Sequence, residues 1–87
     1  MDTDDRVTIL VLDCDLLPDA LEELGDDELL IAVDPSADRL EDLMRRHPDP
    51  RISFLIGDGT VIPLPDRSVD KVLGEGSEAE IRRVLRT

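Results

Sequence analysis

The residues best placed to do chemistry in this sequence are three aspartates, each of which follows a short apolar segment. They are Asp13 after residues 7–12, Asp34 after residues 29–33, and Asp58 between Gly57 and Gly59 after residues 52–56. One cysteine and one histidine cannot supply a cluster with the spacing of a metal site. No side chain is an obvious general base, so we predict no catalytic residue and no metal site. What the aspartates do then depends on the elements that position them.

The segment over residues 7–12 is the one around which the others are arranged. It is apolar except for Thr8 and rich in β-branched residues, a pattern typical of a strand covered on both faces of a parallel sheet. In nucleotide-binding α/β folds, the turn after such a strand approaches the cofactor, and glycines make this approach possible. Here residues 14–19 contain no glycine. The chain has the strand that would position a ligand, without the glycine turn that would hold it.

Strands and helices are predicted to alternate along the chain. The strands are expected over residues 7–12, 29–33, 52–56 and 69–73, and those over 29–33 and 52–56 are expected to be buried. Three helices are expected: one from Pro18 to a Gly25 cap, one that begins at Ser36 with Ala37, Leu40, Leu43 and Met44 inward, and one that begins at Ser77. Strands joined in this way run parallel with right-handed crossovers. We therefore predict an α/β fold: a small three-layer parallel sheet of about four strands, in the order 3-2-1-4, with helices on both faces.

Composition restricts the classes of partner. The 87 residues suffice for one domain, expected over residues 7–87 after an acidic, flexible N-terminus over residues 1–6. A net charge of −12 repels phosphate backbones, and the single aromatic residue, Phe54, gives no stacking platform, so we expect no nucleic-acid partner. No signal-peptide pattern is present, and no apolar run approaches the ~20 residues of a membrane span. We expect no membrane association and a cytoplasmic location.

Four segments, taken together and in this order, resemble one protein family. They are residues 31–36 (IAVDPS), 52–59 (ISFLIGDG), 62–70 (IPLPDRSVD) and 80–86 (EIRRVLR). The chain is similar in these segments to class I S-adenosylmethionine-dependent methyltransferases of the small-molecule type. The resemblance runs over most of the chain and implies a Rossmann-like methyltransferase half-fold with S-adenosylmethionine as the cofactor.

The resemblance also implies which residues bind the cofactor. In the family, an acidic residue at the end of the second strand binds the ribose hydroxyls, and a Gly-Asp pair after the third contacts the adenine amino group. The implied cofactor-binding residues are Asp13, Asp34, Gly57, Asp58 and Gly59. Structural roles stay open beside these: Asp34 before Pro35 also suits the start of a helix, and residues 57–59 also form an ordinary turn signal.

Two departures from the family shape the functional hypothesis. Side chains at residues 14–18 stand where the family has glycines, and Asp15 adds a negative charge near the expected cofactor carboxylate. The family's sheet has seven strands, whereas four are expected here. We therefore expect a truncated, catalytically degenerate binding or assembly module, with a homodimer or a protein partner at the edge of the fourth strand. The alternative is an S-adenosylmethionine-dependent methyltransferase whose acceptor site is completed by a partner chain.

Overall fold

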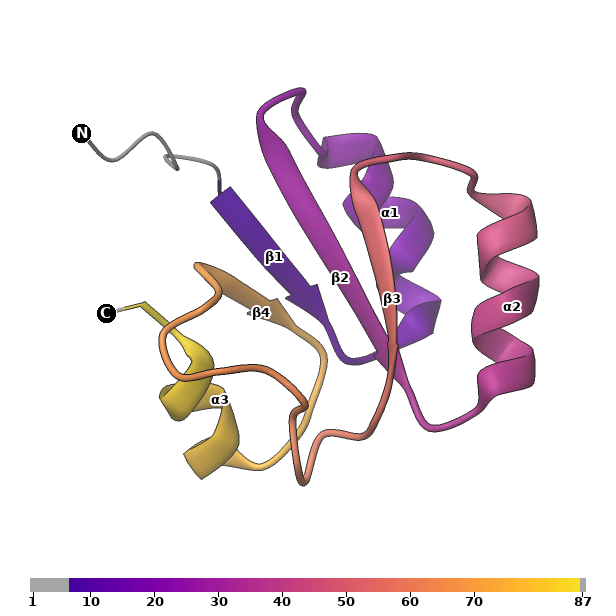
Figure 1. Ribbon diagram of the computed structural model, residues 1–87. Coiled ribbons are helices and arrows are strands. Elements are labelled where there is room, and N and C mark those ends of the chain that lie inside the picture. Colours follow the sequence, from indigo (N-terminus) through magenta and orange to yellow (C-terminus); the bar gives the residue numbers. More distant parts are fainter. Residues whose placement is uncertain (1–6, 87) are drawn as a thin grey trace.

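A computed structural model describes residues 7–86 of the chain, and Figure 1 shows how its elements are arranged. The predicted flexible N-terminus, residues 1–6, lies outside the described residues. The strands are β1 (Val7–Val11), β2 (Glu28–Asp34), β3 (Ile52–Ile56) and β4 (Lys71–Leu73). The helices are η1 (Cys14–Leu16), which is a 3-10 turn, and α1 (Leu17–Glu23), α2 (Ala37–Arg46) and α3 (Glu78–Val84).

The four strands form one parallel sheet in the order β3-β2-β1-β4, as predicted. Side chains from α1 and α2 pack with one face of the sheet, in a core that contains Val11, Leu17 and Leu30. Side chains from α3 and the loop before β4 pack on the other face, with Leu10, Val33 and Ile62. The molecule is a small α/β Rossmann-like fold with helices on both faces. None of the helices within residues 7–86 has the length and apolar character needed to cross a bilayer.

The end of α1 differs from the prediction of a glycine cap. The helix ends at Glu23 with Leu24 as its C-cap, but among the described glycines the one with a positive φ is Gly74, not Gly25. The guanidinium of Arg51 instead donates from Nη1 to the carbonyl oxygens of Leu24 and Gly25, both at 3.1 Å. A distant arginine thus satisfies two carbonyls just beyond the last residue of the helix.

Helix α2 begins as predicted, because the Ser36 hydroxyl accepts the N–H of Arg39 at 3.3 Å. Its predicted inner stripe is only partly correct. Leu40 is buried and Leu43 half-buried, whereas Ala37 is exposed and Met44 is 48% exposed. The reason is the position of α2 beside β3, at the outside of the sheet, where no further strand among the described residues covers the rest of the stripe.

The two outer strands also differ from the prediction. β3 was expected to be buried, but Ser53 and Ile56 are exposed, because β3 is an edge strand with one neighbour. The fourth strand was expected over residues 69–73 and is shorter. Val69 lies outside it and forms an isolated parallel bridge with Leu85.

Candidate functional site

The hollow nearest to the predicted site lies at the carboxyl ends of β1, β2 and β4. Its volume is about 540 Å³, and its lining consists of Leu12, Asp13, Leu16, Asp34, Arg39, Gly74 and Glu75. The strand order changes direction between β1 and β4, and open α/β sheets bind their ligands at such a switch point. The structure thus brings together two of the sequence-predicted residues, Asp13 and Asp34.

Asp34 occupies the end of β2 and is 6% exposed. Its Oδ1 accepts the N–H of Ser36 at 2.8 Å, in the turn that starts α2. Its Oδ2 lies 3.5 Å from Nη1 of Arg39, one turn into that helix. The Asp34 carboxylate therefore has the helix-start role that the sequence left open. Its Oδ2 also lies beside Arg39, whose guanidinium is the only one among the residues that line the hollow.

In the corner after β1, residues 13–16, backbone N–H groups form hydrogen bonds within the corner itself. The Asp13 carboxylate accepts the N–H of Asp15 at 3.0 Å, and the Asp13 carbonyl accepts the N–H of Leu16 at 2.9 Å. Free N–H groups at a strand-to-helix turn are what anionic groups of a nucleotide ligand bind in this fold type. Here two of these N–H groups are already paired with Asp13.

The loop after β4 closes on the same corner. Gly74 has a φ of +101°, and a Cβ at this position would lie 2.8 Å from the backbone nitrogen of Asp13. The Leu12 N–H donates to the Leu73 carbonyl at 2.8 Å just before this contact. The close backbone approach that the family uses for its cofactor is thus used here between two parts of the chain.

Residues 57–59 do not line this hollow. The Asp58 carboxylate accepts the N–H of Thr60 at 2.8 Å, the Thr60 hydroxyl, and the N–H of Val61 at 3.1 Å. These hydrogen bonds, that of the Thr60 hydroxyl above all, hold the pKa of Asp58 below its usual value. Asp58 therefore stabilises its own turn.

The glycines beside Asp58 are also required by packing. A Cβ at Gly59 would lie 2.8 Å from Cα of Gly76, and a Cβ at Gly57 would lie 2.9 Å from the Pro63 ring. The Ser77 N–H donates to the Gly59 carbonyl at 2.6 Å. Gly59 therefore lies where the loops after β3 and β4 pack backbone to backbone, and Gly57 lies against Pro63, so neither glycine requires a ligand to explain it.

These observations allow the fit to S-adenosylmethionine to be assessed. Asp34 could meet a ribose, but Asp58, the expected adenine partner, lies outside the hollow, and two N–H groups of the corner after β1 are already paired. The hollow is lined by three carboxylates, those of Asp13, Asp34 and Glu75, and by one guanidinium. Because like charges repel, this lining disfavours binding of the carboxylate in the methionine part of the cofactor. The residues present fit this cofactor poorly. Within residues 7–86, no group of three or more His, Cys, Asp or Glu could hold a metal ion.

Sequence reasoning missed the two other charged residues of the hollow, Arg39 and Glu75. Glu75 follows β4 as Asp13 follows β1, so the rule that strand ends meet at one edge could have found it. Arg39 lies in the first turn of α2, where an acidic residue is the expected charge, and no sequence signal distinguishes it.

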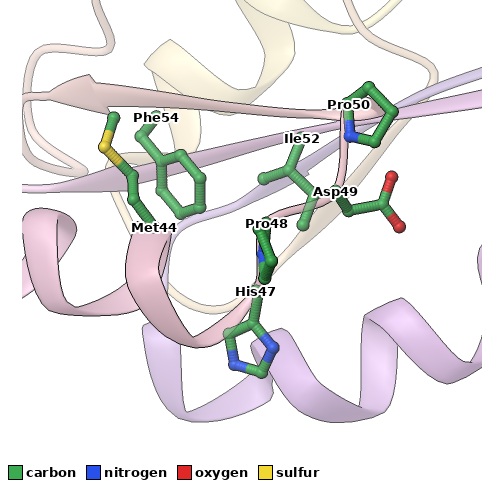
Figure 2. Close-up of a pocket in the computed structure, with 7 residues that line it drawn as sticks. All are labelled: Met44, His47, Pro48, Asp49, Pro50, Ile52 and Phe54. Atoms are coloured by element: carbon green, nitrogen blue, oxygen red, sulfur yellow. The ribbon is translucent and has the colours of Figure 1, made fainter.

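A second pair of hollows lies between α2 and β3, and both are mainly apolar. The larger, of about 420 Å³, is lined by Met44, His47, Pro48, Asp49, Pro50, Ile52 and Phe54. Figure 2 shows Met44 and Phe54 next to each other at one end and the His47–Pro50 segment at the other. The smaller, of about 270 Å³, shares Met44 and Phe54 and extends to Ala37, Leu40, Glu41 and Ile56.

Comparison with models of known protein families, with curated proteins and with solved structures found no match to this chain.

Proposed function

We propose that this chain is a methyltransferase-like binding or assembly module that acts in the cytoplasm through homo- or hetero-oligomerisation and carries out no methyl transfer. The observation that carries the proposal is the corner after β1. Every residue there has a Cβ, and Asp13 takes the N–H groups of Asp15 and Leu16. In such a turn the Cβ atoms hinder the close approach of a cofactor to the backbone, and two of the N–H donors are already used.

The other parts of the resemblance have structural roles that support the same proposal. Asp58 fastens the turn that follows β3, and Gly59 packs on Gly76. Glu80 and Arg83, in the segment that resembles the family's last helix, bind the loop before β4. The motifs thus hold the scaffold together, as expected of a module that has kept the fold and given up the chemistry.

The expected place of assembly was the edge of β4, and the chain itself occupies part of that edge. Arg86 donates its N–H to the Val69 carbonyl at 2.8 Å, and Val69 donates its N–H to the Val84 carbonyl at 2.9 Å. A partner strand at this edge is left with the three residues of β4, Lys71–Leu73.

The alternative is an S-adenosylmethionine-dependent methyltransferase whose acceptor site is completed by a partner chain. One observation favours it: Asp13 and Asp34 meet at a hollow of about 540 Å³ at the switch point of the sheet. Ligand sites occupy volumes of roughly 300–1,000 Å³ and lie at such points.

Calorimetric titration of the full chain with S-adenosylhomocysteine separates the two functions. We expect no heat of binding at millimolar ligand. Binding in the micromolar range that is lost in Asp34→Ala would reject the module and establish the enzyme. Asp38→Ala, which changes an exposed carboxylate on the same helix outside the hollow, is the matched control.

A further inference from the structure

The two outer strands of the sheet differ in how their free edges are treated. At β4, the residues after α3 pair with Val69, as described above. At β3, the ladder to β2 is anchored by the N–H of Leu30, which donates to the Arg51 carbonyl at 2.9 Å, and by the N–H of Gly57, which donates to the Asp34 carbonyl at 3.1 Å. In a parallel sheet, successive residues of a strand direct their backbone N–H and C=O groups to opposite sides of the strand. The backbone groups of residues 51, 53, 55 and 57 therefore face β2.

The backbone groups of Phe54 and Ile56 therefore point away from the sheet. Ile52, which points the same way, donates its N–H to the Asp49 carbonyl at 3.1 Å. Within residues 7–86, the N–H and C=O groups of Phe54 and Ile56 have no hydrogen-bond partner on that side. They form a row of donors and acceptors in the geometry that an added strand requires.

The side chains of this edge are unusual for an unpaired strand. Residues 52–56 contain no charge and no proline, which are the usual means of preventing association at an edge. Ile52, Phe54 and Ile56 alternate along β3 and line the two hollows beside α2. Ile56 is 63% exposed. Alternate apolar residues of an added strand have two hollows to enter, one of about 420 Å³ (Figure 2) and one of about 270 Å³.

Charge decides between the possible occupants. A second copy would bring another net charge of −12 to this surface, and charges of one sign oppose association. The two acidic residues in the hollows are Asp49, which is paired with Arg51 at 2.6 Å, and Glu41. Glu41 forms an exposed pair with Arg45, of the kind that contributes little and can exchange partners. The surface therefore suits a basic partner.

We propose that the edge of β3 binds an extended segment of a partner protein in which basic and apolar residues alternate, and that this segment adds to the sheet as a fifth strand. Its backbone pairs with Phe54 and Ile56, its apolar side chains enter the hollows beside α2, and its basic side chains lie in the field of the acidic chain. The inference rests on the proposed function as a binding module, for which it names the surface and the class of partner.

The test uses the isotopically labelled chain and two blocked heptapeptides, one alternating valine with lysine and the other alternating valine with glutamate. We expect the lysine peptide to shift the amide resonances of residues 52–57 and to slow hydrogen exchange at Phe54 and Ile56 about tenfold at saturation. Its affinity should fall as salt is raised, because the attraction is screened. The glutamate peptide should leave the spectrum unchanged.

Two variants at one position make the result specific to the edge. Ile56→Pro removes an outward N–H without removing a hydrogen bond to β2, and we expect it to abolish peptide binding. Ile56→Lys keeps the backbone and places a positive charge at the edge, and we expect about tenfold weaker binding. Lys71→Gln, an exposed change on β4, is the control and should bind the peptide as the unmodified chain does.

Four results would overturn the proposal: no binding of the lysine peptide, equal binding of both peptides, resonance shifts confined to β4, or dimerisation through β3 without peptide. The titration with S-adenosylhomocysteine is independent of these results. Failure of the peptide with no nucleoside binding removes only the β3 surface, whereas nucleoside binding removes the module itself.

Discussion

The two outer strands of this sheet make an instructive comparison, because within residues 7–86 the chain covers part of the β4 edge and leaves the β3 edge open. Beside β4, the loop residue Ile62 is 2% exposed, and Val69 and Val84 are fully buried. Beside β3, Met44 is half exposed and Ile56 more so. The β4 side is thus built as an interior, whereas the β3 side has the apolar composition of an interior without its cover.

Arg83 is the residue that holds the β4 side closed. Its five N–H donors are used by both Glu80 oxygens, the Ile62 and Leu64 carbonyls, and the Asp66 carboxylate, at 2.8–3.0 Å. The Glu80 carboxylate also accepts the N–H of Ile62 at 2.9 Å. The bonds to Glu80 and Asp66 raise the pKa of Arg83. One side chain thus ties α3 to the loop before β4, and a residue with this role is absent from the described part of the β3 edge.

The largest expected effect comes from a matched pair of isoleucines. Ile62→Ala removes a side chain buried on the β4 side, and we expect a loss of about 2–5 kcal/mol in the free energy of unfolding. Ile56→Ala removes an exposed side chain on the β3 side, and we expect a change within about 0.5 kcal/mol. Urea unfolding of both variants measures the difference. Equal losses would mean that the two sides are equally covered and would end the comparison.

The next largest loss of stability is expected at the contact between Gly76 and Gly59, on the β4 side. A Cβ at Gly76 would lie 2.8 Å from the Gly59 carbonyl oxygen, so Gly76→Ala forces two loops apart and should cost about 1–3 kcal/mol. Gly25→Ala is the control, because its nearest contact is the flexible side chain of Glu28 at 3.2 Å. This control should be neutral or stabilising by up to about 1 kcal/mol. A Gly76→Ala variant as stable as the control would show that the loops are not packed as described.

Low pH should destabilise the folded chain at both sides of the sheet, because each side has one carboxylate that is paired with an arginine. Arg51 lowers the pKa of Asp49 from 3.8 to about 2, and Arg83 lowers the pKa of Glu80. A lowered pKa stabilises the folded state above the unfolded-state value, and this stabilisation is lost as pH falls through the folded-state value. We therefore expect stability to decline from about pH 4 towards pH 2.

The variants Asp49→Asn and Glu80→Gln should each make this decline less steep, since each removes one of the groups that take up a proton on unfolding. Thermal unfolding between pH 5 and pH 2 is the measurement, with Asp38→Asn, which changes an exposed carboxylate outside both pairs, as the control. A decline that is unchanged in both variants would assign acid sensitivity to other carboxylates.

The smallest effect is expected from the exposed pair on α2. Arg45→Ala breaks the 2.9 Å contact with Glu41 and should cost about 0.3–0.5 kcal/mol at low salt, an effect that disappears as salt is raised. It also frees Glu41 beside the β3 hollows, so the lysine peptide should bind slightly more tightly. Weaker peptide binding by Arg45→Ala would show that Glu41 contributes nothing to that surface.

Much of the fold could be predicted from local pattern. The alternation of apolar segments with helical spacing predicted four parallel strands in the right order, and the start of α2 at Ser36 was confirmed by the hydrogen bond that its hydroxyl accepts from the Arg39 N–H. The inward placement of Met44 and the burial of β3 were wrong, because periodicity identifies an apolar stripe but not whether a neighbour covers it. The glycine cap at Gly25 was wrong, because Gly25 is not left-handed; its carbonyl is bound instead by Arg51, 26 residues away.

By itself the sequence determined the strands, their parallel order and the meeting of Asp13 and Asp34 at one end of the sheet, since these follow from short-range periodicity and from the handedness of the crossovers. Only the tertiary structure decided which polar groups remain free. Gly59 packs on a loop 17 residues away, and Arg83 reaches back to Ile62. Hydrogen bonds and close contacts of this kind depend on three-dimensional proximity, which no local pattern of residue types encodes.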